Sequence, residues 1–372
     1  LLFFLLFNQF LAVFLLYLRS NLAGLHLFFK DSIVSVLDRF LLIVFCSFLL
    51  WGNLTTGTFK ISWFIYAQTL SYLLAVIICL FFLLSSTGRF KLNLDLHFSY
   101  VILKKSFPYA LLIFLMTIYY RVDVIMLEVI MGPSEAGVYA GSFRFFEASN
   151  MISYLFAVLL LPIFSKLLKN KKSVSEIVFI AFKIILTFSI TLCVVSIFYN
   201  EELIKLRYEN GQFDNVDSYL EKSFYIFPIL MLCFLFISCT YIFGTLLTAN
   251  GNLYSLNLIA FFGMLFNILL NYFLITKNGA VGASLASFCT QFLTAIAQIL
   301  LCVKIFELKN LKYLVEPILF FTLGLILAGF LTVSYSQLWY INICIFGFLS
   351  IIWSFISGMF KLRYISYIFN ND

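Results

Sequence analysis

Long apolar runs recur along this sequence, and each is long enough to cross a lipid bilayer. A transmembrane helix needs about 20 mostly apolar residues, because the hydrocarbon core is about 30 Å thick and a helix rises about 1.5 Å per residue. The sequence therefore predicts an all-α, polytopic transmembrane helix bundle with about eleven spans. The predicted spans are residues 1–18, 33–52, 61–84, 107–131, 138–165, 175–199, 223–249, 253–276, 279–303, 313–334 and 338–360.

The composition agrees with a membrane protein and excludes several other classes. Hydrophobic residues make up 63% of the chain and charged residues 11%, whereas a soluble domain is about half apolar and a quarter charged. The connectors, such as 200–222, are too short to fold into an extramembrane domain. The eight cysteines lie in apolar runs without a CxxC pair, and no nucleic-acid-binding signature is present. We therefore predict no enzyme, no cofactor, no metal site and no nucleic-acid partner.

Lysine and arginine gather in alternate connectors, which predicts the orientation of the chain, because cytoplasmic loops of membrane proteins are enriched in these residues. This pattern predicts a cytoplasmic C-terminus and places the acidic 200–222 connector in the periplasm. The predicted periplasmic side holds Lys60, Lys205, Arg207, Lys222 and Lys277, whereas the predicted cytoplasmic side holds Arg19, Lys30, Arg39, Arg89, Lys91, Lys104, Lys105, Lys166, Lys169, Lys171, Lys172, Lys304, Lys309, Lys312, Lys361 and Arg363.

Charged residues inside predicted spans are candidate functional residues, because a charge in the hydrocarbon core is costly. Spans 107–131 and 138–165 run antiparallel through a short turn, so Asp123 and Arg144 lie at similar depth and an ion pair between them is geometrically allowed. Arg144 and Glu147 share one helix face, whereas Arg121 and Asp123 point in nearly opposite directions. The full set is Arg121, Asp123, Arg144, Glu147 and Lys183.

Two interpretations of these charges remain open. They form an ion-pair network that locks helices together, or Arg144, with Arg121 and Lys183, faces a wet cavity and binds phosphate or acidic sugars. Guanidinium suits the second role because its planar fork donates two hydrogen bonds at once. A cation-coupling role for Asp123 or Glu147 is a third interpretation. Lys183 lies close enough to the cytoplasmic end to reach the membrane surface, and with Thr187 and Thr191 it forms one polar stripe.

Three segments carry a resemblance to a known family. They are Tyr119 to Leu127 followed by Gly132-Pro133 and Glu135 to Ala140; Phe146-Glu147 to Leu161-Pro162; and Gly244 to Ala286, which includes Leu246 to Gly251, Asn267, Asn271 and Asn278 to Ala286. From about residue 107 onward the chain resembles the oligosaccharide and polysaccharide flippases (Wzx type) of the MATE-like transporter superfamily. Glu128 departs from the family pattern, in which a small or apolar residue is common.

The resemblance implies a fourteen-helix plan with two pseudo-symmetric lobes around a central cavity. Residues 1–106 would then be the C-terminal half of the first lobe with three spans, residues 107–306 the six-span second lobe, and residues 307–372 two additional spans. Because the chain begins at Leu1 within an apolar run, we expect three further helices upstream of it.

The function that the resemblance implies is transport of a lipid-linked (polyprenyl pyrophosphate) oligosaccharide. It would pass from the cytoplasmic to the periplasmic leaflet of a bacterial inner membrane by alternating access, for O-antigen or another surface polysaccharide. The expected partners are this substrate, membrane lipids and other membrane proteins of polysaccharide assembly. Two alternatives remain: a cation-coupled small-molecule exporter of the same superfamily, and a membrane-embedded oligosaccharide polymerase, which the small 200–222 connector disfavours.

Overall fold

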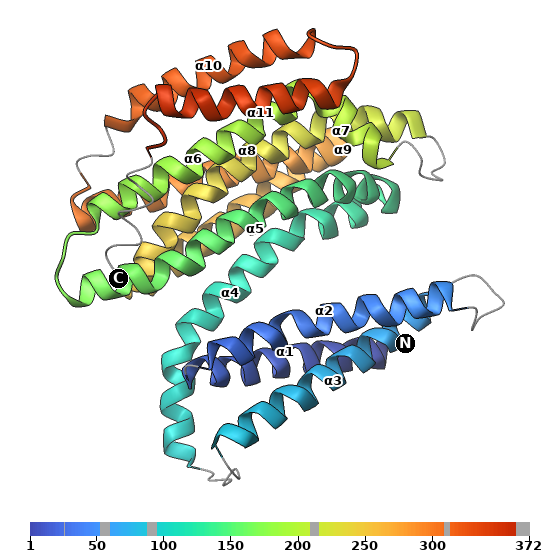
Figure 1. Ribbon diagram of the computed structural model, residues 1–372, viewed down its shortest axis with the longest axis vertical. Helices are drawn as coiled ribbons and strands as arrows, with labels where there is room; N and C mark the ends of the chain where they lie inside the picture. Colours follow the sequence, from blue (N-terminus) through green and yellow to red (C-terminus); the bar gives the residue numbers. More distant parts are fainter. Residues whose placement is uncertain (26, 53–59, 88–94, 209–215, 309–312, 362–372) are drawn as a thin grey trace. The chain divides into compact units, whose positions relative to one another are not determined.

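The computed structural model is helical throughout the residues it describes, which are 1–25, 27–52, 60–87, 95–208, 216–308 and 313–361 (Figure 1). Ten helices in these ranges are long and apolar enough to cross a membrane, which confirms the predicted polytopic helix bundle. Several charges used to predict the orientation lie outside the described residues or have undescribed side chains: Arg89, Lys91, Arg207, Lys309, Lys312 and Arg363.

The first compact unit, Leu1–Ser99, contains three long helices. They are α1 (Leu2–Gly24), α2 (Phe28–Trp51) and α3 (Ile61–Thr87), and α3 packs against both others. Each contains one predicted span, including the 33–52 span that Asp38 and Arg39 interrupt. Leu15, Leu22 and Cys79 are among the buried residues of its core.

The second unit is Tyr100–Asp372, and α4 (Leu96–Met131) begins just before it. The predicted span 107–131 starts later than this helix, because α4 already begins at Leu96 and Pro108 lies inside it. The backbone N–H of Phe98 donates to Oδ1 of Asp95 at 3.0 Å, so Asp95 is the helix N-cap that the sequence analysis missed. The predicted domain boundary at residue 106 lies within α4.

Seven more helices follow α4 among the described residues of the second unit. Helix α8 packs against α5, α6 and α9, and the α10–α11 pair lies against α6 (Figure 1). The short α7 lies in the connector predicted to be periplasmic. The helices are α5 (Pro133–Lys169), α6 (Ser175–Phe198), α7 (Asn200–Tyr208), α8 (Val216–Ala249), α9 (Leu253–Phe306), α10 (Val315–Val333) and α11 (Trp339–Ile356).

Helix α9 is a hairpin of two membrane-length halves. Its 54 residues would extend about 80 Å if straight, far more than the hydrocarbon core. The backbone breaks at Gly279, where φ is 55° and ψ is −132°. Beyond this break the two halves approach closely, because a Cβ at Gly282 would collide with the carbonyl of Leu274. The predicted spans 253–276 and 279–303 are therefore both present.

Glu135, at the start of α5, contacts both α8 and the bend in α9. One carboxylate oxygen forms an ion pair with Lys222 of α8. The other accepts a hydrogen bond from the backbone N–H of Ala280 at 3.0 Å. That N–H begins the second half of α9 and has no partner within the helix, so the carboxylate satisfies it and complements the positive helix end.

Replacing Gly279 with alanine is expected to destabilise the protein by about 2 kcal/mol or more. A non-glycine residue with a positive φ is strained, and the new Cβ would lie 2.7 Å from Oε2 of Glu135. The measurement is thermal unfolding of purified protein in detergent. Gly347→Ala in α11 is the control, because a Cβ there meets nothing within 4 Å. Equal unfolding temperatures for both variants would contradict the strain at the α9 bend.

Candidate functional site

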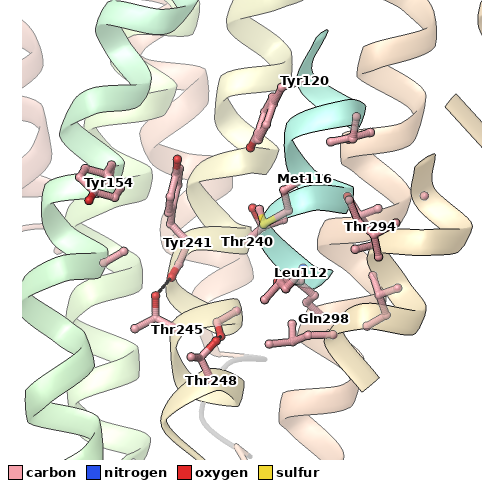
Figure 2. A pocket seen from close by; sticks show the side chains of 18 of the residues that line it. Leu112, Met116, Tyr120, Tyr154, Thr240, Tyr241, Thr245, Thr248, Thr294 and Gln298 are labelled. Atoms are coloured by element: carbon pink, nitrogen blue, oxygen red, sulfur yellow. Dashed lines mark hydrogen bonds between the residues drawn. The ribbon is translucent and has the colours of Figure 1, made fainter. Parts of the chain in front are cut away.

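A neutral cavity of about 370 Å³ lies among α4, α5, α8 and both halves of α9 (Figure 2). None of the residues that line it is charged. Most of the surface that lines this cavity is apolar, and its polar groups belong to tyrosine, threonine and glutamine side chains. The polar residues are Tyr119, Tyr120, Tyr154, Thr240, Tyr241, Thr245, Thr248, Gln291, Thr294 and Gln298.

The polar groups of the neutral cavity keep capacity for hydrogen bonds to a ligand. The Thr245 and Thr248 hydroxyls donate to carbonyls of their own helix, so their oxygens still have lone pairs to accept with. Gln298 lies over Gly244, where a Cβ would come within 3.1 Å of its Oε1. This oxygen is buried and has no hydrogen-bond partner. The rings of Tyr154 and Tyr241 meet edge to face, with centroids 6.4 Å apart.

A second cavity, of about 290 Å³, carries charge and adjoins the first. Tyr120 and Tyr241 line both cavities, so the two spaces share a wall. Arg121, Glu147 and Asn150 also line the second cavity. The structure therefore places charged and uncharged recognition groups side by side within the second unit.

Arg121, Glu147 and Arg144 form an ionic cluster between α4 and α5. The Glu147 carboxylate lies 2.8 Å from Nη1 of Arg144 and 3.4 Å from Nη2 of Arg121. The arginine side chains are 61% (Arg121) and 75% (Arg144) exposed in this structure. One carboxylate cannot neutralise two guanidinium groups, so the ionic cluster keeps a net positive charge and accessible donors.

The ion pair between Asp123 and Arg144, which sequence geometry allowed, does not form. Asp123 contacts Tyr139 of α5, whereas Arg144 lies five residues further along, about 140° around the same helix. Arg144 therefore points away from Asp123 and pairs with Glu147 on its own helix face.

Asp123 is instead held by a buried network of uncharged donors. Its carboxylate accepts hydrogen bonds from the hydroxyl of Tyr139 at 3.1 Å, from Nδ2 of Asn271 at 2.6 Å and from the hydroxyl of Ser287. Asn271 and Ser287 lie on opposite halves of the α9 hairpin, equally far from Gly279. The side-chain oxygen of Asn271 is buried without a partner, and a void of about 10 Å³ borders Asp123, about the space for one water or small cation.

Lys183 lies apart from the arginines and lines neither cavity. It is buried in α6, and its Nζ donates to the carbonyl of Gly358 at 2.8 Å. Gly358 follows the C-terminal end of α11, where a cation is favourable. In the predicted stripe, the hydroxyls of Thr187 and Thr191 donate to carbonyls of their own helix.

Replacing Lys183 with methionine is therefore expected to leave transport within about twofold of wild type. Its expected effect is on the α6–α11 contact, because the Gly358 carbonyl loses a charged donor whose hydrogen bond contributes about 1.5–3 kcal/mol. Thermal unfolding measures the stability, and a transport assay on the same preparation measures the function. A loss of transport at unchanged stability would instead indicate that Lys183 takes part in substrate binding.

Several residues of the two cavities and the buried network were not predicted from the sequence. Ser287, Tyr241 and Gln298 are uncharged, and such residues are frequent in helix contacts of membrane proteins. A weak signal existed for the buried network, since Asn267 and Asn271, four residues apart, occupy one face of α9 and belong to the segment that carried the family resemblance.

The family comparison covers the helices that hold the ionic cluster and Asp123. Residues 108–273 match the MatE family model. This match agrees with the resemblance to the MATE-like superfamily that the sequence motifs indicated. The matched segment includes Arg121, Asp123, Arg144 and Glu147, whereas Ser287 lies beyond its end.

A comparison of structures extends the likeness beyond the segment that matches the MatE model. The chain is similar to a solved structure described as lipid II flippase MurJ in an inward closed conformation, with a TM-score of 0.71 and 20% sequence identity. The match covers 94% of this chain and 72% of that chain. At this identity the likeness establishes the fold. No curated protein matches the chain at a significant level.

Proposed function

We propose that the chain is a flippase that moves a lipid-linked (polyprenyl pyrophosphate) oligosaccharide from the cytoplasmic to the periplasmic leaflet by alternating access. The observation that carries this proposal is the ionic cluster, in which two exposed guanidinium groups face one carboxylate on membrane-spanning helices. Charges at such positions are costly and are retained where they bind or conduct something polar. The match of residues 108–273 to the MatE model and the likeness of the fold to a flippase both support a transporter of this kind.

The ionic cluster suits a pyrophosphate group. Each guanidinium donates paired hydrogen bonds to phosphate oxygens, and pyrophosphate carries more negative charge than the single carboxylate of Glu147. The substrate would therefore compete with Glu147 for Arg121 and Arg144. Glu147 keeps the two cations together while the substrate is absent. The glycan would be O-antigen or another surface polysaccharide.

We further propose the location that the charge distribution indicates, a bacterial inner membrane with a cytoplasmic C-terminus. Most lysines and arginines of the short connectors then lie in the cytoplasm. Membrane lipids surround the helices, and other membrane proteins of polysaccharide assembly would supply and receive the substrate.

Asp123 is proposed as the group that couples transport to a proton or a small cation. The Asp123 carboxylate, the Asn271 amide and the hydroxyls of Tyr139 and Ser287 provide oxygen ligands of the kind that hard cations prefer. The side-chain oxygen of Asn271 that lacks a partner supports this role. The same network also supports the alternative function, a cation-coupled exporter of small molecules. The net positive ionic cluster disfavours cationic drugs as the cargo.

Deleting the gene in the source organism tests the proposal. Surface polysaccharide should disappear, and its lipid-linked precursor should accumulate in the cytoplasmic leaflet, out of reach of a membrane-impermeant lectin added to spheroplasts. Restoring the gene should make the precursor reachable again. Normal surface polysaccharide together with lost efflux of a fluorescent dye would favour the exporter instead.

A further inference from the structure

The neutral cavity has a different chemistry from the ionic cluster that adjoins it. Its lining offers tyrosine rings, threonine hydroxyls and glutamine amides but no charge. A phosphate or an ammonium group in this space would lose its hydration without gaining a counter-charge, which is strongly unfavourable. The occupant must therefore be uncharged.

The occupant must also combine apolar and hydrogen-bonding surfaces. A tyrosine side chain has an apolar ring face and a polar hydroxyl, and the rings of Tyr120, Tyr154 and Tyr241 border the neutral cavity from three helices (Figure 2). A pyranose sugar has the same two kinds of surface, because C–H groups lie on its faces and hydroxyls lie around its edge. The volume of about 370 Å³ is within the usual range of small-ligand pockets.

An apolar lipid chain fits this lining less well than a sugar. A polyprenyl chain would leave Oε1 of Gln298, which already has no partner, buried in an apolar contact. Burying an unsatisfied polar atom is unfavourable, whereas a sugar hydroxyl can donate a hydrogen bond to this oxygen.

Tyr120 and Tyr241 line both cavities, so a group bound in one cavity lies beside a group bound in the other. We propose that the neutral cavity binds the uncharged sugar that adjoins the pyrophosphate of the lipid-linked substrate, while the ionic cluster binds the pyrophosphate. This inference rests on the proposed function and specifies the substrate: its first sugar is neutral. Gln298 is its specificity-determining residue.

The test measures binding of three defined lipids to the purified full chain in nanodiscs by calorimetry. They are polyprenyl pyrophosphate, the same lipid carrying one N-acetylglucosamine, and the same lipid carrying one glucuronic acid. Wild type should bind the N-acetylglucosamine form about tenfold more tightly than the other two. Gln298→Leu, of similar size but without an amide, should remove the preference for the N-acetylglucosamine lipid over polyprenyl pyrophosphate and leave the affinity for polyprenyl pyrophosphate unchanged.

Thr276→Val is the matched control, because Thr276 lies on α9 outside the neutral cavity and bonds only its own helix. It should retain the tenfold preference. The sugar site would be overturned if Gln298→Leu weakened the binding of all three lipids equally. It would also be overturned if polyprenol that carries no head group displaced the N-acetylglucosamine lipid. If wild type binds none of the three pyrophosphate lipids, the proposed function itself fails. Wild-type binding without a sugar preference rejects only the sugar site.

Discussion

Replacing Arg121 and Arg144 together with glutamine is expected to reduce glycan export by about a hundredfold or more. A hydrogen bond to a charged group contributes about 1.5–3 kcal/mol, and a tenfold change corresponds to about 1.4 kcal/mol. Losing one such interaction from each guanidinium therefore removes about 3–6 kcal/mol of substrate binding. Glutamine is shorter but keeps a polar amide that can donate hydrogen bonds, so the substitution removes the charge without introducing an apolar side chain.

The measurement is the rate at which lipid-linked oligosaccharide reaches the periplasmic leaflet, normalised to the amount of folded protein. Arg39→Gln is the matched control, because Arg39 is also an exposed arginine on a membrane-length helix but lies in the first unit. The control should export at the wild-type rate. Normal export by the double variant would show that transport does not require the ionic cluster.

The helices could be predicted from the sequence because membrane spans have a strong compositional signal. The break in α9 was also predictable, since Gly279 divides an apolar stretch too long for one span. The start of α4 was missed because the apolar residues before Pro108 are interrupted by Lys104 and Lys105. The Asp95 N-cap, a single side chain, was a weaker signal than those charges.

Part of the ionic cluster could be predicted because it depends on local spacing. Arg144 and Glu147 are three residues apart on one helix, so their contact follows from helix geometry. The partners of Asp123 could not be predicted in this way. Asn271 and Ser287 are distant from it in the sequence and meet it only because α9 folds back on itself. Intramembrane charge drew attention to Asp123, but its neutral partners have no such signal.

The neutral cavity was not predictable from the sequence for a related reason. Its polar residues come from four helices, and on each helix they look like ordinary contacts between transmembrane segments. We expected a cationic cavity and assigned Lys183 to it. The structure instead separates Lys183 from the arginines, because α6 faces the α10–α11 pair. Only the packed arrangement shows that charged and neutral spaces adjoin.

Substitutions of Asp123 are expected to separate its structural role from its coupling role. Asp123→Leu removes the acceptor of three buried donors, each worth about 1 kcal/mol or more, and should destabilise the protein by about 3 kcal/mol. Asp123→Asn keeps an acceptor oxygen and similar size, so it should fold with a smaller loss. Thermal unfolding of both variants measures this difference. Ser189→Ala provides the control, because Ser189 is equally buried but bonds only its own helix.

Asp123→Asn should nevertheless lower transport at least tenfold and remove its dependence on a cation or proton gradient. The reason is that an amide neither takes up a proton nor attracts a cation as a carboxylate does. Binding of a pyrophosphate lipid to the ionic cluster should stay within about twofold of wild type, because Arg144 points away from Asp123. Transport in vesicles with and without an imposed gradient measures the coupling. A variant that still responds to the gradient would show that Asp123 only holds α4, α5 and α9 together.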